Sequence, residues 1–291
     1  MKEFKLNVGA SPIWNNDEWY ILDHKKSKYK NSILGDAANI SLEDNTVDVI
    51  FCSHVIEHIP QIKISDVLAE FNRILKPVGI LRLLSPDLHK IASAYVNKDK
   101  NFFDKALEED YNLRTDLGYG GILANWFVSP GQDTILLDRN LTTFITGQAH
   151  QIIYDFEMIS ILLKNFGFDN IFQKEFLDSE HQDLRVPLHV DGFDPVWQNF
   201  NRDFYKKNNL IHQYNEKTGK YEINFGVKGF DRDPLTSLIV ECKKSINVKA
   251  DNEFTLSKNN YNRYGYSLLF DEDVRNKLDS MGIKYKNPFQ K

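Results

Sequence analysis

Cysteine is scarce in this chain of 291 residues, and the marks of a secreted or membrane protein are missing with it. Both cysteines, Cys52 and Cys242, lie inside apolar, strand-like runs, where a cysteine is usually a buried thiol. No apolar run approaches the ~18 residues of a membrane span, and no signal-peptide core precedes the segment FKLNV. We therefore expect a protein of the reducing cytoplasm, without disulfides and without membrane insertion.

An excess of positive charge is also missing. The chain has 36 Lys and Arg against 41 Asp and Glu, which gives a formal net charge of −5, and the two signs are interspersed. Such a surface has no basic field that follows a phosphate backbone, so nucleic acid is not expected as a main partner. The length allows one large core with additions, in a monomer or a homodimer.

What the chain does contain is a series of short apolar runs. The first five are FKLNV (4–8), WYILD (19–23), SILGD (32–36), VDVIFC (47–52) and GILRLLS (79–85). They are bounded by Gly, Asp, Asn or Pro, as expected for strands buried on both faces of a parallel sheet. Two later strands are expected in residues 169–177 and 235–244, where they close the sheet. The fold class is therefore α/β.

Helical spacing of apolar residues predicts three helices. The first lies between the fourth and fifth strands, with Ser65 as N-cap and its end at Lys76, before Pro77 and Gly79. The second has Asp155 as N-cap and Gly167 as a left-handed C-terminal residue. A third, short helix is expected over residues 271–282, with Asp271 as cap and Gly282 as stop.

Two stretches interrupt the alternation of strands and helices. Residues from about 88 to 150 and from 179 to 233 do not continue it, and we interpret both as insertions. The chain is thus divided into a main domain over residues 1–245, which contains both insertions, and a polar C-terminal extension over residues 246–291.

Candidate binding residues directly follow the strands, because ligands of open parallel sheets bind at the carboxyl ends of the strands. Gly9 permits close approach of a ligand to the backbone, and a carboxylate such as Asp23 can accept hydrogen bonds from both hydroxyls of a ribose. Asp36 and Ala37 follow the third strand, where an adenine amine can be met. Each of these residues alone also fits an ordinary turn.

As a set, four segments resemble a known family. In chain order they are LNVGASP, WYILDH, GDAANISLEDNTVDVIFCSHVIEHI and EFNRILKPVGILRLLSPD. They are similar to class I S-adenosylmethionine-dependent methyltransferases of the type 11-like group, with HVIEH after the fourth strand and LKPVG before the fifth. The resemblance covers residues 4–87 and resumes at 150–176. It implies a Rossmann-like, seven-stranded, mainly parallel sheet with helices on both faces.

The resemblance also implies S-adenosyl-L-methionine as cofactor and nine cofactor-binding residues. These are Asn7, Gly9, Ala10 and Ser11 along the methionine part, Asp23 at the ribose, Asp36 and Ala37 at the adenine, and Ser53 and His54 beside the sulfonium. The chain departs from the family where Gly9 stands alone instead of in Gly-x-Gly. Residues 9–18 are also too few for a crossover helix, so another segment is expected to cover that side of the pocket.

The segment SHVIEHI (53–59) also spells H-x-x-E-H, a zinc-protease signature. That reading requires a sustained helix that continues past both histidines and a further ligand from another helix. Here a strand runs directly into the motif and Pro60 follows His58 closely. We therefore predict no metal site, with Ser53 and His54 at the cofactor and Glu57 and His58 in the supporting wall.

On the acceptor side, Asp87 and His150 are the predicted catalytic residues, Asp87 as an acceptor contact and His150 as a general base. Asp87 also fits the cap of a following helix, and a lone histidine also fits a purely structural role. In the insertions, GYGGILANWF offers a glycine hinge beside Trp126, and HVDGFDPVWQNF offers Trp197 near His189, Asp191 and Asp194. Aromatic faces with carboxylates suit sugar rings.

The expected function is methyl transfer to oxygen of a sugar, a sugar nucleotide or another small acceptor in surface-glycan or secondary metabolism. The alternative is a catalytically silent methyltransferase fold that serves as a binding module. A nicotinamide-dependent enzyme is disfavoured, because no G-x-G-x-x-G turn opens a helix.

Overall fold

The structure is a computed structural model that describes residues 2–11, 14–109, 117–128, 150–186, 188, 211–215, 220–223, 236–248 and 272–280. It divides into two compact units, Met1–Asp251 and Asn252–Lys291. In the second unit the described residues form one helix, α11 (Glu272–Ser280), within the stretch predicted to be helical. The predicted cap Asp271 and stop Gly282 lie outside the described residues. The boundary placed after residue 245 stays a prediction.

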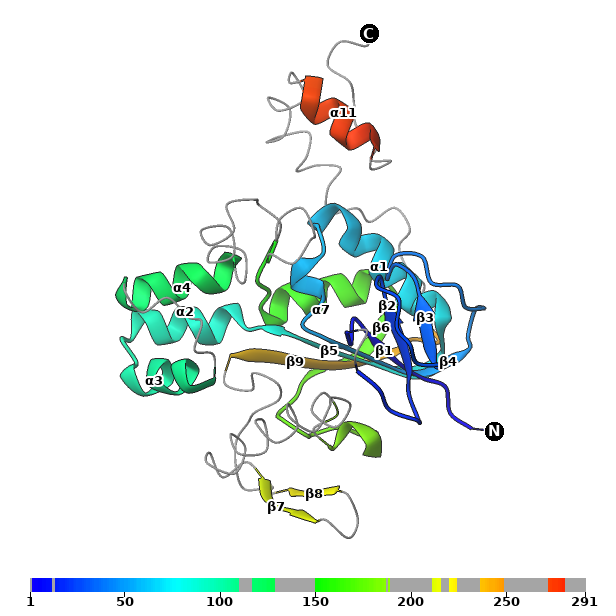
Figure 1. The fold of residues 1–291 in the computed structure, drawn as a ribbon, viewed down its shortest axis with the longest axis horizontal. Coiled ribbons are helices and arrows are strands. Elements are labelled where there is room, and N and C mark those ends of the chain that lie inside the picture. Colours follow the sequence, from blue (N-terminus) through cyan, green and yellow to red (C-terminus); the bar gives the residue numbers. More distant parts are fainter. Residues whose placement is uncertain are drawn as a thin grey trace. The chain divides into compact units, whose positions relative to one another are not determined.

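Seven strands of the first unit form one sheet in the order β3-β2-β1-β4-β5-β9-β6 (Figure 1). They are β1 (Lys5–Val8), β2 (Tyr20–Asp23), β3 (Ser32–Leu34), β4 (Val47–Ser53), β5 (Leu75–Pro86), β6 (Phe168–Gln173) and β9 (Ser237–Lys244). The first five pair in parallel, and β9 is antiparallel to both β5 and β6. The predicted Rossmann-like, mainly parallel sheet and its closing strand pair are confirmed.

Two helices lie along one face of this sheet, α1 (Gln61–Ile74) and α7 (Phe156–Asn165) (Figure 1). The caps predicted for α7 are correct, since the Asp155 side chain accepts from the Met158 N–H and Gly167 has a φ of 78°. The predicted limits of α1 are wrong. Its N-cap is Pro60, whose missing N–H is not needed at a helix start. It ends at Ile74, because Leu75 already pairs with Val47 of the sheet.

On the opposite face of the sheet, buried residues from outside the strands pack against sheet residues. Leu184 and Leu188, from the second predicted insertion, pack with Trp14 and Trp19. The cluster also contains sheet residues of β2, β4, β5 and β9, namely Ile21, Val49, Phe51, Leu84 and Ile239. In the described part of residues 9–18 there is no helix, as the short spacing predicts. The first of these two leucines, Leu184, is the last residue of a 3-10 turn, η2 (Gln182–Leu184).

In its described residues, the first predicted insertion forms helices beyond the carboxyl end of β5: α2 (Leu88–Val96), α3 (Lys100–Glu109) and α4 (Gly118–Val128) (Figure 1). The predicted glycine hinge is wrong, because GYGG forms the first turn of α4. Trp126 packs in a cluster with Ile91, Phe103 and Ile153. Its ring therefore packs the insertion, which is the alternative to stacking on a sugar ring.

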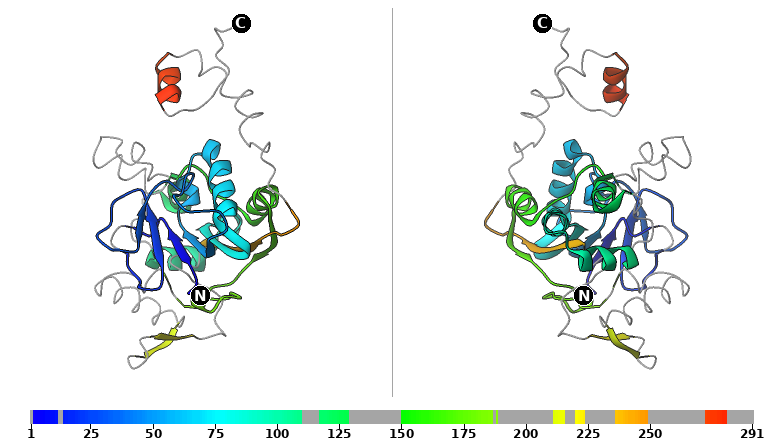
Figure 2. Two further views of the ribbon diagram at one scale, coloured as in Figure 1. Left: turned by 90° about the vertical axis from the view of Figure 1, so that its right-hand side faces the viewer. Right: turned by 90° about the vertical axis from the view of Figure 1, so that its left-hand side faces the viewer.

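In the second insertion, β7 (Ile211–Asn215) and β8 (Lys220–Ile223) pair as an antiparallel hairpin (Figure 2). The candidates Trp197, His189, Asp191 and Asp194 lie outside the described residues. Among the helices that the structure describes, none combines the length and the apolar character that a membrane span requires.

Candidate active site

Gly9 occupies the turn after β1 in a conformation that only glycine adopts without strain. Its φ is 70°, and its N–H donates to the Leu22 carbonyl at 2.8 Å. A Cβ at this position would lie 2.3 Å from Cγ2 of Val55, which follows β4. The backbone of the β1 turn therefore touches the segment that carries His54 and Glu57.

Asp23 ends β2, and two backbone amides orient its carboxylate. Oδ2 accepts from the Ser11 N–H at 3.1 Å, and Oδ1 accepts from the Lys25 N–H at 2.8 Å. The residue is 8% exposed. Each oxygen has a second lone pair, so the carboxylate can accept further bonds from a pair of adjacent hydroxyls.

The other predicted cofactor residues are distributed along the same sheet. Asp36 is exposed in a turn closed by a bond from the Ala38 N–H, and Ala37 follows it. Ser11 has a φ of 80°. Ala10 is buried in the cluster under the tryptophans, and Asn7 is buried within β1. Their contacts with a cofactor stay predictions.

Two buried polar atoms in this region have no hydrogen-bond partner among the described residues. They are Nδ2 of Asn7 and Oγ of Ser53, in residues that are 2% and 6% exposed. A buried polar group without a partner is costly, and such groups usually bind water or a ligand. Both residues were predicted from the sequence to bind cofactor, so their free atoms fit a polar ligand at this edge of the sheet.

The segment after β4 turns sharply and places a carboxylate among three imidazoles. His54 has a φ of 53°, and residues Ile56–His58 form the 3-10 turn η1. Glu57 is fully buried, and its Oε1 lies 3.0 Å from Nδ1 of His54. Nε2 of His54 lies 3.0 Å from Oγ of Ser237 in β9. Both ring nitrogens of His54 are thus engaged by protein groups.

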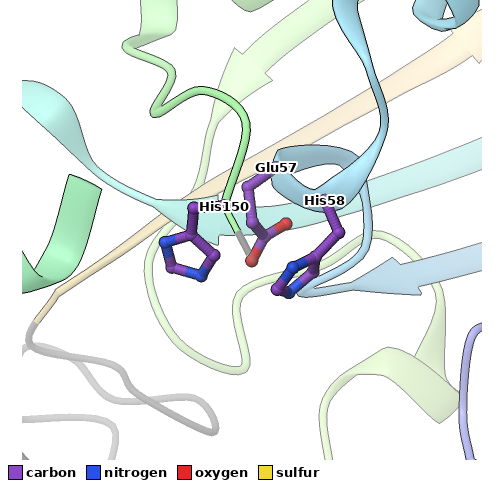
Figure 3. A group of neighbouring side chains, drawn as sticks. All are labelled: Glu57, His58 and His150. Carbon is purple, nitrogen blue, oxygen red and sulfur yellow. The ribbon is translucent and has the colours of Figure 1, made fainter. Parts of the chain in front are cut away.

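His150 reaches this carboxylate from a distant part of the chain. Ligand atoms of Glu57, His58 and His150 lie within 4.8 Å of one another, and Figure 3 shows the carboxylate between the two rings. The N–H of Gln151 donates to the Glu57 carbonyl at 2.7 Å. This bond ties the segment before α7 to η1, so it joins residues 57 and 151, which are 94 positions apart.

The charges in this cluster follow from its burial. Burial alone raises the pKa of the Glu57 carboxyl, but the hydrogen bond from His54 and the nearby imidazoles outweigh it and lower the pKa. Burial lowers the pKa of His150 to about 4, against the opposing effects of Glu57 and of the Trp126 carbonyl. At neutral pH the Glu57 carboxyl is therefore ionised and the His150 ring is neutral.

Asp87, the predicted acceptor contact, is the N-cap of α2. Its side chain accepts from the His89 and Lys90 N–H groups at 2.9 and 3.2 Å, and the residue is 2% exposed. The structural alternative is thus realised, while a contact with the acceptor stays a prediction.

Two variants separate the capping role of Asp87 from a contact with the acceptor. Asp87→Ala removes the cap and is expected to lower the free energy of unfolding by about 1 kcal/mol, whereas Asp87→Asn keeps a capping oxygen and is expected to change it little. Thermal unfolding of both variants checks this. If Asp87→Asn unfolds like the wild type but loses methyl transfer, the carboxylate also serves the acceptor.

Sequence reasoning missed three members of this site. Glu57 and His58 were assigned to a supporting wall, although they adjoin His150 directly. Tyr154 was not singled out; its buried hydroxyl has no partner among the described residues, and burial and Glu57 raise its pKa. The signal for the first two was the H-x-x-E-H spelling itself.

One comparison with known proteins matches part of the chain to a family model. A family model described as a methyltransferase domain matches residues 18–83, which run from β2 into β5 and contain Asp23, Asp36, Ser53 and His54. None of the curated proteins compared with the chain is significantly similar to it.

Solved structures that align with the chain include two S-adenosylmethionine-dependent methyltransferases. The protein from Archaeoglobus fulgidus is 13% identical over 83% of this chain and 86% of its own, with a TM-score of 0.39. The protein from Thermotoga maritima is 11% identical over 84% and 83%, also with a TM-score of 0.39. These values are too low to transfer any property of those proteins to this chain.

The sheet order and the carboxyl-edge residues define a Rossmann-like domain for a nucleoside-containing cofactor. Residues 18–83 are similar to a methyltransferase domain, as HVIEH and LKPVG predict. The residues fit this cofactor, because Asp23 presents an oriented carboxylate at the end of β2 and Ser53 presents an unpaired buried hydroxyl.

Proposed function

We propose that this methyltransferase transfers the methyl group to a hydroxyl oxygen of a small acceptor, of the class of sugars and sugar nucleotides. The observation that carries the cofactor half of the proposal is the Asp23 carboxylate. Its two oxygens are held by different backbone amides, from Ser11 and Lys25, and a free lone pair remains on each. That geometry suits the two adjacent hydroxyls of a ribose.

The chemistry needs little beyond positioning on the cofactor side. S-adenosylmethionine, when bound, supplies a methyl carbon that an acceptor oxygen attacks while the carbon–sulfur bond breaks and its electron pair stays on sulfur. Of the protein's own groups, Asp23 fixes the ribose, and the His54 turn borders the reacting end in the assignment that the family resemblance implies. The rate then depends on alignment of the acceptor oxygen and on removal of its proton.

His150 is the group proposed to serve the acceptor. Its Nδ1 lies 2.6 Å from the Trp126 carbonyl, and a carbonyl can only accept, so Nδ1 carries the ring proton. In the neutral imidazole the lone pair is therefore on Nε2. That lone pair is available to interact with the acceptor end of the site.

The sequence of the second insertion supports a sugar as acceptor. Residues 189–197 combine His189, Asp191, Asp194 and Trp197. Aromatic rings stack on the C–H faces of sugars, and carboxylates accept bonds from their hydroxyls. Acceptors of this kind place the protein in cytoplasmic steps of surface-glycan or secondary metabolism.

A silent binding module is the alternative function, and the β1 turn favours it. Ser11 has a φ of 80° at a position where family members commonly carry glycine, and Ala10 packs into the core. A turn constrained in this way can keep the fold while it loses the cofactor.

Titration calorimetry with S-adenosylhomocysteine separates the two functions. The wild type is expected to bind, and Asp23→Ala is expected to weaken binding by about 1–3 kcal/mol, because charge-assisted hydrogen bonds to the ribose are lost. Asp66→Ala is the matched control, since this exposed carboxylate lies on α1. A folded wild type that gives no heat at millimolar ligand supports the silent module, and equal affinity of Asp23→Ala shows that the ribose binds elsewhere.

A further inference from the structure

The group of Glu57, His58 and His150 has the composition and spacing of a metal-ligand set. It offers one carboxylate and two imidazoles, with ligand atoms within 4.8 Å of one another (Figure 3). The ring centroids of His58 and His150 lie 4.8 Å apart, and the ring planes are inclined by 61°. The carboxylate of Glu57 lies between the two rings (Figure 3). Two imidazoles with one carboxylate form known Zn²⁺ and Fe²⁺ sites that keep open coordination positions.

The burial of Glu57 points to a cation at this place. The residue is fully buried, and its Oε2 has no hydrogen-bond partner among the described residues. Oε1 lies 3.0 Å from Nδ1 of His54, which accounts for only one of the two oxygens. Burying a carboxylate costs free energy unless the carboxylate is paired or coordinates a metal, and here Oε2 has no partner of either kind among the described residues.

Hydrogen bonds with neighbouring protein groups already orient the candidate ligands, as they do in known metal sites. The Trp126 carbonyl fixes the ring proton of His150 on Nδ1 and leaves Nε2 as the donor atom. Ser237 fixes His54, which in turn orients the carboxylate of Glu57. His58 and His150 are half-buried, so an ion can reach the site and its open positions can reach solvent or a substrate.

We propose that Glu57, His58 and His150 bind one divalent transition-metal ion, such as Zn²⁺, Fe²⁺ or Co²⁺, and that the ion's open positions bind a hydroxyl oxygen of the acceptor. Imidazole ligands favour these ions over Mg²⁺ and Ca²⁺, which prefer oxygen. The second part rests on the proposed function. The site differs from the pair of histidines suggested by H-x-x-E-H, because His150 takes the place of His54.

A bound ion changes how the acceptor is activated. A hydroxyl on a divalent cation has a lower pKa than in water, so its proton is released to solvent while the oxygen stays on the ion. That oxygen then forms the bond to the methyl carbon as the carbon–sulfur bond breaks. His150 still serves the acceptor, but through the ion, and its Nε2 lone pair is a ligand rather than a base.

A second group of candidate ligands, Glu3, His181 and Asp183, is less suited to an ion. Lys5 bonds the Asp183 carboxylate and therefore already supplies a cation there. Glu3 has a side-chain exposure of 53%. Residues of this group provide the matched control for the proposal.

The test uses the full chain, freed of metal with a chelator and titrated with Co²⁺ while its visible absorption is followed. The wild type is expected to bind one ion. His150→Gln and Glu57→Gln are expected to raise the Kd for Co²⁺ by more than about 100-fold, beyond the 10- to 100-fold effect of changes outside the ligands. His181→Gln is expected to leave the Kd near the wild-type value, because His181 belongs to a different group of side chains. Circular dichroism establishes which variants are folded.

Several outcomes overturn the proposal. They are a wild type that binds no stoichiometric Co²⁺, a folded His150→Gln that binds as tightly as the wild type, and a loss of binding in His181→Gln. If buried Glu57→Gln does not fold, half-buried His150→Gln decides. Titration of S-adenosylhomocysteine is the separate arm: failure there with intact Co²⁺ binding removes the proposed function and leaves the ion site, and the reverse result removes the ion site alone.

Discussion

Replacing Glu241 by alanine is expected to lower the free energy of unfolding by about 3–5 kcal/mol, because a guanidinium is left buried without its counter-charge. Arg82 of β5 lies opposite Glu241 of β9, and Nη1 and Oε2 are 3.0 Å apart with side-chain exposures of 1% and 5%. Glu241 also accepts from Oγ of Ser179 at 2.6 Å. A domain of this size loses about 2–4 °C in unfolding midpoint per kcal/mol, so thermal unfolding resolves the effect.

The control for this prediction is the exposed pair of Lys100 and Asp104 on α3. Its side-chain exposures are 77% and 53%, so solvent screens the attraction and Asp104→Ala is expected to leave the midpoint nearly unchanged. Glu241→Gln keeps a hydrogen-bond acceptor and should fall between the wild type and Glu241→Ala. Equal midpoints for Glu241→Ala and Asp104→Ala would mean that the buried pair is dispensable.

The buried pair also explains why the cover of one sheet face was hard to foresee. The strands of Arg82 and Glu241 are recognisable as apolar runs, but each contains a buried charged residue whose partner depends on the strand order. Arg82 donates to the Asp178 carbonyl at 2.7 Å as well, so the pair anchors the chain that leads to Leu184. The short connection between β1 and β2 predicts that a crossover helix is missing there. The segment that covers the sheet in place of this helix depends on contacts between positions about 100 residues apart.

Local signals predicted the sheet and the α7 caps well, and they failed where packing overrides them. Ser65 is a good N-cap residue, yet it lies buried inside α1. Three glycines in GYGG suggest a hinge, but the apolar residues that follow, such as Ile122 and Trp126, pack against Phe103 and stabilise a helix. Tertiary burial of an apolar face outweighs the weak helix propensity of glycine.

The candidate site residues were predicted in two ways. Gly9 and Asp23 follow from strand ends, because parallel strands bring their carboxyl ends to one edge, whereas Ser53 and His54 follow from the family resemblance. The contact of His150 with Glu57 follows no such rule. It depends on the backbone bond from Gln151 to Glu57 and on α4, which supplies the Trp126 carbonyl.

Replacing Gly9 by alanine is expected to destabilise the domain by about 2–5 kcal/mol and to abolish binding of S-adenosylhomocysteine. The left-handed φ of 70° costs an alanine about 1–2 kcal/mol. Overpacking against Val55, where the new Cβ meets Cγ2 at 2.3 Å, costs about 1–3 kcal/mol more. Because Val55 connects His54 to η1, the clash displaces both sides of the cofactor edge together.

A double-mutant cycle separates the two causes. In Gly9→Ala/Val55→Ala the clash is removed and the φ strain remains, so a favourable coupling of about 1 kcal/mol or more is expected. Gly120→Ala is the control, because Gly120 lies in α4 and a Cβ there would be in ordinary contact with Oη of Tyr95, at 3.8 Å. There alanine is expected to stabilise the helix by about 0.5–1 kcal/mol. Additive effects of Gly9→Ala and Val55→Ala would show that Val55 does not limit the turn. Restored ligand binding in the double variant would establish that the clash with Val55, and not the strain of the β1 turn, disrupts the cofactor edge.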